Sequence, residues 1–341
     1  MPTAYPPDTR PPAVFRDGDV LPGGLRGAAV AIGNFDGVHR GHRGLVDTAR
    51  SLAHPHGRPA AVLTFDPHPR AFFAPDRPHF RLTPEPVKLK VLAASGADLI
   101  IVRRFDAALA ATSAADFVFG LLRDELGASE LVIGGDFHFG RGREGTPAVL
   151  SELATEAGLG LTVSGTVEVG GASVSSSRIR DALRAGRVTE ANELLGYRWF
   201  VSGTVVHGRK LGRTLGYPTA NLRLDPGCEL AHGIYAVRLA TADGVRRDGV
   251  ASFGRRPTFD DGAPLLEVHV LDFASDLYGQ EVEVEFVAWI RAEERFDSAD
   301  ALVVRMRMDE AEARRALRGA PGGRDVSLIG GPTPLYRPAG G

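Results

Sequence analysis

Short apolar runs alternate with stretches of helical periodicity through the first half of the chain. The apolar runs predict strands at Ala28–Asn34, Ala60–Phe65, Asp98–Arg103, Glu130–Gly134 and Leu161–Val169. Apolar residues recur with helical spacing in His42–Leu52, Val87–Ala94, Ala114–Leu126 and Ala148–Ala157. Alternation at this spacing favours an α/β domain of Rossmann-like type, with a mainly parallel sheet and right-handed crossovers.

The pattern changes after two short helical segments, Ser177–Arg184 and Thr189–Leu195, which we interpret as a connector. The strands that follow are short and separated by Gly, Pro and Asp clusters, which predicts a mainly antiparallel β-barrel. They are Trp199–His207, Gly233–Ala240, Arg247–Phe253, Leu265–Phe273 and Gln280–Ile290. The amphipathic segment Ala299–Leu317 predicts a closing helix, and the Gly- and Pro-rich tail after Gly319 is expected to be disordered.

Length and composition are those of an ordinary two-domain globular protein. The chain has 341 residues, 43% hydrophobic and 24% charged, and a net charge of −2. That charge offers no basic surface for nucleic acid or an anionic membrane, so any phosphate site must be local. No apolar run approaches the roughly 20 residues of a membrane span, and we expect a cytoplasmic protein. The single Cys228 excludes an internal disulfide and a cysteine-built zinc site.

One motif joins the first predicted strand to the first predicted helix: Gly33-Asn34-Phe35-Asp36-Gly37-Val38-His39-Arg40-Gly41-His42. Its two histidines lie at a helix start, where free backbone N–H groups and the helix dipole attract phosphate. Imidazole can donate a hydrogen bond, and imidazolium can cancel charge on phosphate oxygens. Its glycines let the backbone approach a nucleotide closely. A zinc half-site or a solvated turn is the alternative.

Two further loops follow predicted strands of the same sheet. The segment Thr64-Phe65-Asp66-Pro67-His68-Pro69-Arg70 offers Asp66 and His68 to a substrate or metal, or is a proline-stiffened loop. In Gly134–Gly145, aromatic side chains can stack on a flat ring while arginines face phosphate. A mobile surface loop is the alternative for this second segment. The carboxyl ends of parallel strands are where ligands bind in such folds.

A serine-rich, basic segment, Ser175-Ser176-Ser177-Arg178-Ile179-Arg180, precedes the first connector helix. Hydroxyls and backbone N–H groups can hold phosphate there, and arginine forks can neutralise it. Serine at a helix start is also an ordinary N-cap, so this alternative stays open.

The second half opens with a glycine-rich loop, Gly208–Asn221, whose glycines can keep a phosphate-covering loop thin. Thr219 and Asn221 offer hard oxygen ligands for Mg²⁺. The loop lacks the usual P-loop pattern, and a glycine-rich hairpin is the alternative. Glu267 lies on an alternating strand and could accept a hydroxyl proton or simply face solvent. For Arg291, Glu293 and Phe296, after the last strand, the alternative is a surface salt bridge.

Together these motifs resemble the bacterial bifunctional riboflavin kinase/FMN adenylyltransferase (FAD synthetase) family. The Gly-x-Phe-Asp-Gly-Val-His-x-Gly-His, Thr-Phe-x-Pro-His-Pro and Ser-Ser-x-x-Ile-Arg signatures of its nucleotidyltransferase half match here, as does Leu82-Thr83 with Lys88. Its kinase half matches in the Leu-Gly-aromatic-Pro-Thr-Ala-Asn loop and in the later segments Gly233-Ile234-Tyr235, Arg256-Pro257-Thr258-Phe259, Glu267-Val268-His269, Asp276-Leu277-Tyr278-Gly279 and Arg291…Phe296.

Two departures from the family pattern stand out. Ser177 replaces a usual threonine but keeps the hydroxyl, and Ser252-Phe253-Gly254 stands where Asn-Ile-Gly is common. The second departure puts a flavin contact in doubt.

The resemblance implies a two-step FAD synthesis with ATP, riboflavin and FMN as substrates and Mg²⁺ as cofactor. It implies His39, His42 and Glu267 as catalytic residues, and Thr219 and Asn221 as magnesium ligands. The implied ATP contacts of the first half are Gly33, Phe35, Asp36, Gly41, Ser175, Ser176, Ser177, Arg178 and Arg180. The implied FMN contacts are Phe65, Asp66, His68, Asp136, Phe137 and Phe139. Those for ATP in the kinase half are Gly208, Lys210, Gly212, Gly216, Thr219 and Asn221, and those for riboflavin are Arg291, Glu293 and Phe296.

The expected organisation is an adenylyltransferase domain at 14–185, a helical connector at 186–197, a kinase barrel at 198–318 and a tail at 319–341. We expect flavins and ATP as partners, neither nucleic acid nor membrane, and a monomer or weak homo-oligomer. Three other hypotheses remain: one active half with the other as scaffold, a flavin-binding regulator without turnover, and a nucleotidyltransferase for another phosphorylated acceptor.

Overall fold

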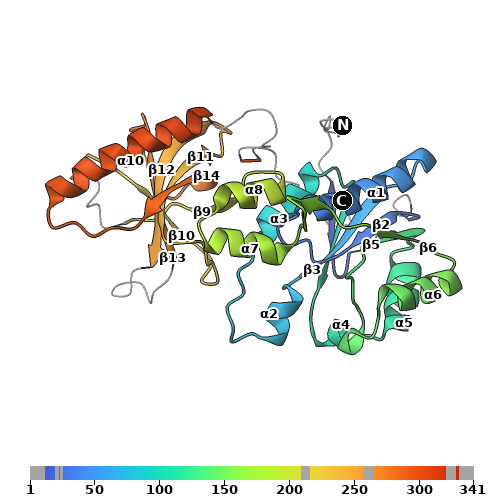
Figure 1. Ribbon diagram of the computed structural model, residues 1–341. Helices are drawn as coiled ribbons and strands as arrows, with labels where there is room; N and C mark the ends of the chain where they lie inside the picture. Colours follow the sequence, from blue (N-terminus) through green and yellow to red (C-terminus); the bar gives the residue numbers. More distant parts are fainter. Residues whose placement is uncertain are drawn as a thin grey trace. The chain divides into compact units, whose positions relative to one another are not determined.

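The computed structural model describes residues 12–19, 23, 26–208, 216–255, 264–319 and 328–329. Within them the chain forms two compact units (Figure 1). The first unit comprises the described residues up to Pro78 together with Thr83–Val174. The second comprises His79–Leu82 and the described residues from Ser175 onward. The connector helices therefore group with the second unit, and the division falls before them.

The first unit is built on a six-stranded sheet in the order β1-β4-β3-β2-β5-β6, with every neighbouring pair parallel. β2 is buried along its whole length and β3 along nearly all of it, as expected for strands covered on both faces. The strands are β1 Ala13–Arg16, β2 Ala29–Ile32, β3 Ala60–Asp66, β4 Leu99–Arg104, β5 Glu130–Gly134 and β6 Gly160–Ser164. The predicted parallel α/β domain is confirmed.

Helices cover this sheet on both sides (Figure 1). α1, the helix Arg40–Ala53, packs on β2, β3 and β5. On the other side, Phe117, Leu122 and Leu150 belong to the core cluster that contains Val30 and Ile32. The remaining helices of the unit are η2 His54–His56, α2 Pro69–Phe73, α3 Glu85–Ala94, α4 Ala107–Ala111, α5 Ala114–Asp116, η3 Phe117–Glu125, η4 Arg141–Arg143 and α6 Pro147–Ala157.

Two predicted elements of this unit were wrong in detail. The strand predicted at Leu161–Val169 ends at Ser164, and its last residues form a hairpin, β7 Glu168–Val169 with β8 Ala172–Ser173. The hairpin turns at Gly170 and Gly171, both at positive φ, which glycine tolerates without a steric penalty. The helix predicted at Ala114–Leu126 changes after α5 into the π-helix η3. Apolar spacing alone does not distinguish these helix types.

The second unit is a nearly closed antiparallel barrel in the order β10-β13-β12-β11-β14-β9. An isolated bridge between Val206 and Asn221 links the residues after β9 to β10. The strands are β9 Phe200–Thr204, β10 Ala220–Arg223, β11 Gly233–Thr241, β12 Arg246–Arg255, β13 Pro264–Val270 and β14 Glu281–Ala292. This confirms the predicted barrel, although β10, like β1, was missed because its apolar run is short.

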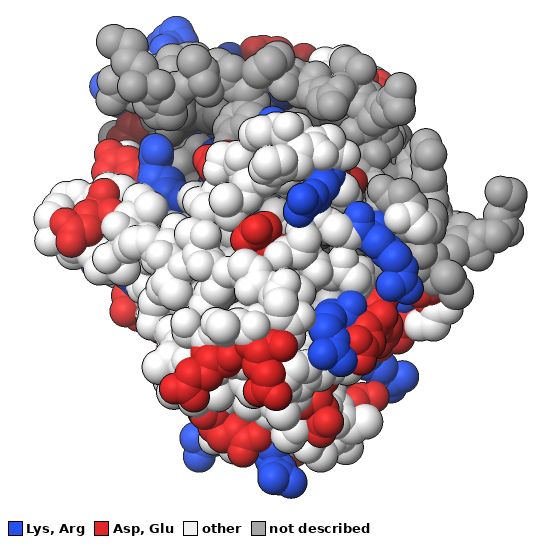
Figure 2. All heavy atoms as spheres, turned by 90° about the vertical axis from the view of Figure 1, so that its right-hand side faces the viewer, with Lys and Arg blue, Asp and Glu red and all other residues white. Residues whose placement is uncertain are grey.

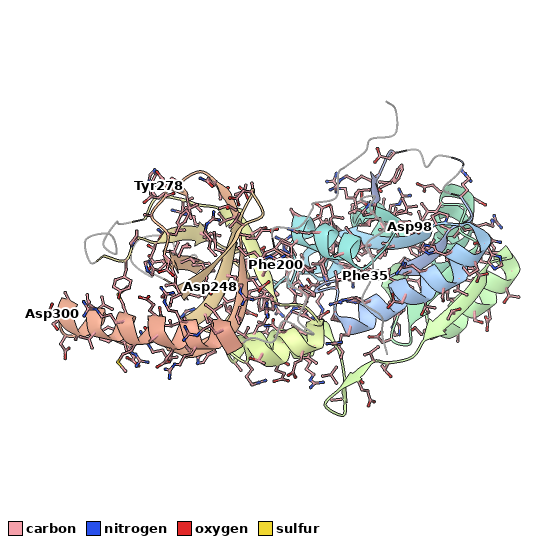
Figure 3. The ribbon with its side chains drawn as sticks, turned by 90° about the horizontal axis from the view of Figure 1, so that it is seen from above. Phe35, Asp98, Phe200, Asp248, Tyr278 and Asp300 are labelled. Atoms are coloured by element: carbon pink, nitrogen blue, oxygen red, sulfur yellow. The ribbon has the colours of Figure 1, made fainter. Side chains whose placement is uncertain are left out.

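Three helices accompany the barrel. α7 is Ser176–Arg184 and α8 is Val188–Leu195, which packs on β14. α10, Ala299–Gly319, lies along β11, β12 and β14 and buries Ala313 and Leu317 (Figures 1 and 3). The predicted disordered tail lies mostly outside the described residues. One residue that is described, Ile329, is buried, and its carbonyl accepts a hydrogen bond from Arg246 Nε at 3.0 Å.

Candidate active sites

The histidine turn of the first unit follows β2, at the point where the strand order reverses. β3 and β4 add to one side of β2, and β5 and β6 add to the other. Ligands of open α/β sheets bind at the carboxyl ends of strands beside such a switch point. The loops after β3 and β5 flank the turn because those strands are the neighbours of β2. The structure therefore brings the three predicted loops of this unit to one edge.

His39 is the N-cap of α1. Its backbone is extended, and its Nδ1 accepts a hydrogen bond from the His42 backbone N–H at 3.3 Å. The two imidazole rings stack, with centroids 3.7 Å apart and an interplanar angle of 14°. A Cβ at Gly41 would lie 3.1 Å from His39 Cε1, so glycine leaves room for this stack. Among the described residues, neither histidine belongs to a group of three metal-ligand side chains.

The electrostatics of the pair favour a neutral His42. Burial lowers the pKa of this imidazole, and positive charge at His39 and Lys88 lowers it further. The Nδ1 atom of His42 is buried and has no hydrogen-bond partner within the described part of the chain. An anionic phosphate arriving here would favour the charged imidazolium, which could then stabilise charge on the phosphate oxygens.

The Phe35 and Asp36 side chains of the turn point into the protein. Phe35 is fully buried, and its ring lies 5.0 Å from the His42 ring. The carboxylate of Asp36 is also buried and accepts a hydrogen bond from the Thr83 backbone N–H at 3.1 Å. A Cβ at Gly33 would lie 3.4 Å from Phe35 Cε2, and one at Gly41 would lie 3.1 Å from His39 Cε1, so glycine at both positions leaves room for these rings. Contacts from this turn to a nucleotide would therefore come mainly from N–H groups and not from these side chains.

The predicted FMN contacts lie at the end of β3, where Phe65 and Asp66 belong to the strand, and on the loops after β3 and β5. Phe65 and Phe139 are buried in the core of the unit, so they shape a wall. Phe137 is half-buried and stacks on Phe139 with ring centroids 5.5 Å apart. His68 caps α2 by accepting a hydrogen bond from the Arg70 backbone N–H at 3.1 Å. Asp136 is exposed on the loop after β5.

The serine-rich segment belongs to the second unit. Ser175 caps α7 by accepting a hydrogen bond from the Arg178 backbone N–H at 3.3 Å, so the N-cap alternative is confirmed for this serine. Ser176 is half-buried and Ser177 exposed, and Arg178 lies 3.7 Å from Glu190. The guanidinium of Arg180 is buried.

Arg180 has a structural task in the same unit. Its Nε donates to the Phe80 carbonyl at 2.7 Å, and Phe80 packs edge-on against Trp199. The Trp199 indole in turn donates to the Leu82 carbonyl at 2.8 Å. These contacts hold the segment His79–Leu82 within the second unit.

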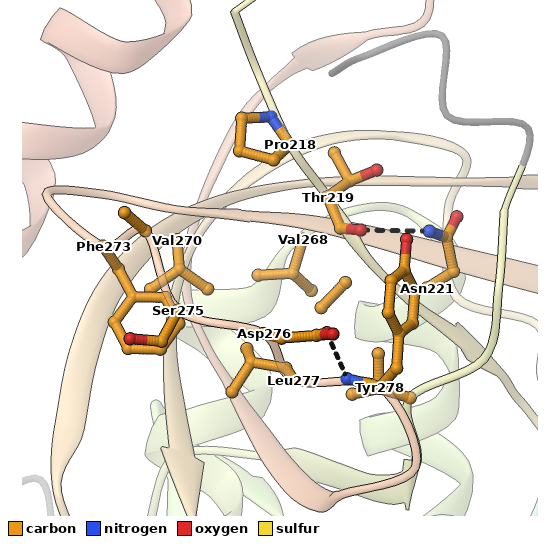
Figure 4. Close-up of a pocket in the computed structure, with 13 residues that line it drawn as sticks. Pro218, Thr219, Asn221, Val268, Val270, Phe273, Ser275, Asp276, Leu277 and Tyr278 are labelled. Atoms are coloured by element: carbon orange, nitrogen blue, oxygen red, sulfur yellow. Dashed lines mark hydrogen bonds between the residues drawn. The ribbon is translucent and has the colours of Figure 1, made fainter.

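The predicted magnesium ligands lie at the start of β10. Asn221 is only 3% exposed, and its Nδ2 donates to the Thr219 carbonyl at 3.1 Å (Figure 4). Its Oδ1 is buried and receives no hydrogen bond within the described residues. Glu267 of β13 pairs directly with Asn221, which places both side chains on the same face. A Cβ at Gly208 would lie 2.6 Å from Asn221 Nδ2, so any larger residue there would displace the Asn221 side chain.

A cleft of about 130 Å³ opens beside Thr219 and Asn221 (Figure 4). Its far wall is the loop after β13, where the Tyr278 backbone N–H donates to Asp276 Oδ1 at 2.9 Å. The Tyr278 ring also contacts the His207 ring in a tilted arrangement, with centroids 3.9 Å apart and an interplanar angle of 40°. The sequence around Tyr278 does not indicate that this residue lines the same cleft as Thr219, because the two are far apart in the chain.

The remaining predicted kinase residues divide into three groups. Lys210 and Gly212 lie outside the described residues, as does the segment 256–259, whereas Gly216 has a positive φ of 84°. Arg291 is held by Asp309 of α10 through two hydrogen bonds of 2.8 and 2.6 Å. Both side chains are largely buried, so this ion pair is not the surface salt bridge of the alternative. The hydrogen bond to the Asp309 carboxylate raises the pKa of Arg291. Phe296 lies 5.9 Å from this guanidinium, and the exposed Glu293 lies over Gly254.

Comparison with protein families matches each half separately. Residues 22–178 match the FAD synthetase family, and residues 195–317 match the riboflavin kinase family. Curated relatives whose names give both activities align with most of this chain and with nearly all of their own length. The bifunctional riboflavin kinase/FMN adenylyltransferase of Escherichia coli K12 is 41% identical, over 84% of this chain and 92% of its own length. The Bacillus subtilis protein of the same name is 34% identical, with the same coverage.

A solved structure has the same fold. The crystal structure titled a macrolide-efflux protein from Streptococcus pneumoniae superposes with a TM-score of 0.79 and 31% identity, covering 88% of this chain and 98% of that one. In the described part of this chain, no helix has the length and apolarity needed to cross a membrane.

Proposed function

The chain belongs to the family of bifunctional riboflavin kinases/FMN adenylyltransferases, and from this we infer that it makes FAD in two steps. Its C-terminal half phosphorylates riboflavin with ATP to FMN. Its N-terminal half then transfers AMP from a second ATP to FMN, giving FAD and pyrophosphate. The observation that carries this inference is that one chain presents both a stacked histidine pair at a helix start and the Thr219–Asn221–Glu267 group.

In the adenylyl transfer, a phosphate oxygen of FMN attacks the α-phosphorus of ATP. The bond from that phosphorus to the bridging oxygen breaks, and pyrophosphate leaves with its electron pair. Because the nucleophile is already an anion, no base is needed. His39 and His42 stabilise the charge that develops on the phosphate oxygens.

We propose the remaining contacts of this step as follows. Gly33, Phe35, Asp36 and Gly41 contact ATP through the backbone of the turn, which the burial of the Phe35 and Asp36 side chains supports. Ser175, Ser176, Ser177, Arg178 and Arg180 bind its β and γ phosphates. The FMN contacts are Phe65, Asp66, His68, Asp136, Phe137 and Phe139.

In the kinase step, Glu267 takes the proton of the riboflavin ribityl hydroxyl while the ribityl oxygen attacks the γ-phosphorus of ATP. The bond from that phosphorus to the bridging oxygen breaks, and ADP leaves. Such transfer depends mainly on alignment and charge stabilisation. Bound Mg²⁺ would neutralise charge on the transferring phosphates. The buried Oδ1 of Asn221, which has no hydrogen-bond partner among the described residues, and the hydroxyl of Thr219 suit this hard cation.

The other kinase contacts are proposed from the family pattern. Gly208, Lys210, Gly212 and Gly216 cover the phosphates of ATP. Riboflavin contacts Arg291, Glu293 and Phe296, and the Asp309 carboxylate holds the Arg291 guanidinium in place.

We propose that flavins and ATP are its only partners, that it acts in the cytoplasm, and that it is a monomer or weak homo-oligomer. The net charge of −2 supports the absence of a nucleic-acid partner. On the face shown in Figure 2, acidic and basic side chains are interspersed, without a continuous basic surface.

One assay tests the function. Purified protein is incubated with riboflavin, ATP and Mg²⁺, and the flavins are separated by chromatography. FMN that appears first and FAD that follows support the two-step pathway. FMN alone or FAD formation only from added FMN would indicate one active half, and neither product would indicate a binding protein.

A further inference from the structure

The turn that carries the catalytic histidines has a strained backbone. Phe35 and Val38 have positive φ angles of 50° and 36°, although neither is glycine. Gly37 between them has a φ of 85°. A non-glycine residue in this backbone region is strained and persists only where surrounding contacts enforce it. Something must therefore hold this turn.

Thr83, at the N-terminal side of α3, makes those contacts. Its hydroxyl accepts a hydrogen bond from the Gly37 N–H at 2.8 Å and lies 3.4 Å from Asp36 Oδ1. Its backbone N–H donates to the same carboxylate oxygen at 3.1 Å. Thr83 is 4% exposed and Asp36 is 5% exposed, so water does not compete with these bonds. Thr83 thus binds the two residues at the centre of the strained turn.

A second anchor holds the beginning of the turn. Lys88 of α3 donates to the Thr64 hydroxyl at 3.2 Å and to the Phe65 carbonyl at 3.0 Å. The fully buried Thr64 hydroxyl donates to the Asn34 carbonyl at 3.1 Å. There are thus two anchors, Thr83 and the Lys88–Thr64 pair. Thr83 lies just before α3, Lys88 lies on α3, and Thr64 lies on β3.

We propose that Thr83, supported by the Lys88–Thr64 pair, is a positioning residue for adenylyl transfer. It fixes the turn so that His39 can cap α1 and stack on His42. In this account Thr83 does not bind the nucleotide, and it acts on the histidines through its hydrogen bonds to Gly37 and Asp36. The proposal rests on the adenylyltransferase function proposed above.

The test compares Thr83→Val, which keeps the shape but loses the hydroxyl, with Thr83→Ser, which keeps the hydroxyl. Displacement by about 1 Å can cost on the order of 100-fold in rate. We expect Thr83→Val to lower kcat for FAD formation by about 10- to 100-fold. Thr83→Ser should stay within about 3-fold of the wild type. FMN formation by the kinase half serves as the internal control and should not change.

Wild-type kcat in Thr83→Val, or an equal loss in Thr83→Ser, would overturn the proposal. Thermal unfolding is recorded alongside. A purely structural role would lower the melting temperature but would leave kcat unchanged at assay temperatures well below the melting temperature. If Thr83→Val does not fold, Thr64→Val and Thr64→Ser are compared in the same way, and wild-type kcat in Thr64→Val overturns the proposal. Failure of the proposed function itself is recognised separately, since the wild type would then form no FAD.

Discussion

Replacing Gly41 by alanine should separate stability from adenylyl transfer. Gly41 lies in the first turn of α1, where alanine is intrinsically preferred to glycine by roughly 0.5–1 kcal/mol in a helix interior. The new Cβ, however, would lie 3.1 Å from His39 Cε1 and 3.2 Å from its Nδ1. The imidazole must then move by a few tenths of an ångström. It cannot do so freely, because it is 7% exposed and stacked on His42.

The two effects oppose each other in stability but not in catalysis. Overpacking of this kind costs about 1–3 kcal/mol and the helix preference for alanine offsets about 0.5–1 kcal/mol, so the free energy of unfolding should fall by about 0–2.5 kcal/mol. A displacement of the histidine pair should lower kcat for FAD formation by about 10-fold or more. FMN formation should be unchanged. Both rates are measured with purified protein by chromatography of the flavins, and stability is measured by thermal unfolding.

Gly44→Ala is the matched control on the same helix. A Cβ at Gly44 meets only Val167 Cγ2, at an ordinary 3.8 Å. This variant should gain about 0.5–1 kcal/mol and keep both activities. The reasoning is refuted if Gly41→Ala forms FAD at the wild-type rate, or if Gly44→Ala loses as much activity as Gly41→Ala.

Three other outcomes are expected. The folded-state pKa of His42 is below the unfolded value of about 6.5, so its contribution to stability is present above that pH and lost as the pH falls below it. His42→Asn should therefore lose less stability than the wild type between about pH 7.5 and 5.5 in chemical denaturation, and equal losses would contradict the lowered pKa. Asn221→Leu removes the unpaired Oδ1 and should reduce FMN formation by about 100-fold or more while FAD still forms from added FMN; retained kinase activity would exclude Asn221 as a magnesium ligand. Arg180→Met leaves the buried Phe80 carbonyl without its donor and should lower the free energy of unfolding by about 1–3 kcal/mol, whereas unchanged stability would show that this bond contributes nothing.

Much of the fold follows from local pattern. Fully buried parallel strands such as β3 are continuous apolar runs, and β13 alternates buried and half-buried residues along its whole length. The missed elements are short or depend on distant partners. β10 has four residues, and pairing with β13 makes it a strand. The π-helix η3 was missed because its apolar spacing fits an α-helix as well.

The candidate sites divide in the same way. The histidine turn was predictable because its residues are contiguous and its chemistry is local. The roles of Thr83 and Lys88 were not, since each acts on a loop that lies many residues away in the chain. Arg180 and Arg291 show the opposite problem. The sequence motif alone does not show what each guanidinium binds. Only the fold reveals that Arg180 donates to the Phe80 carbonyl and Arg291 to the Asp309 carboxylate.

The central claim is that two separate sites on one chain act in succession, and mixing two inactivated variants tests it most directly. With riboflavin, ATP and Mg²⁺, His42→Asn alone should stop at FMN, and Glu267→Gln alone should leave riboflavin unchanged. An equimolar mixture should form FAD, because FMN released by one variant is adenylylated by the other. If either variant loses both activities while it remains folded, or if the mixture forms no FAD although FMN accumulates, the claim is contradicted.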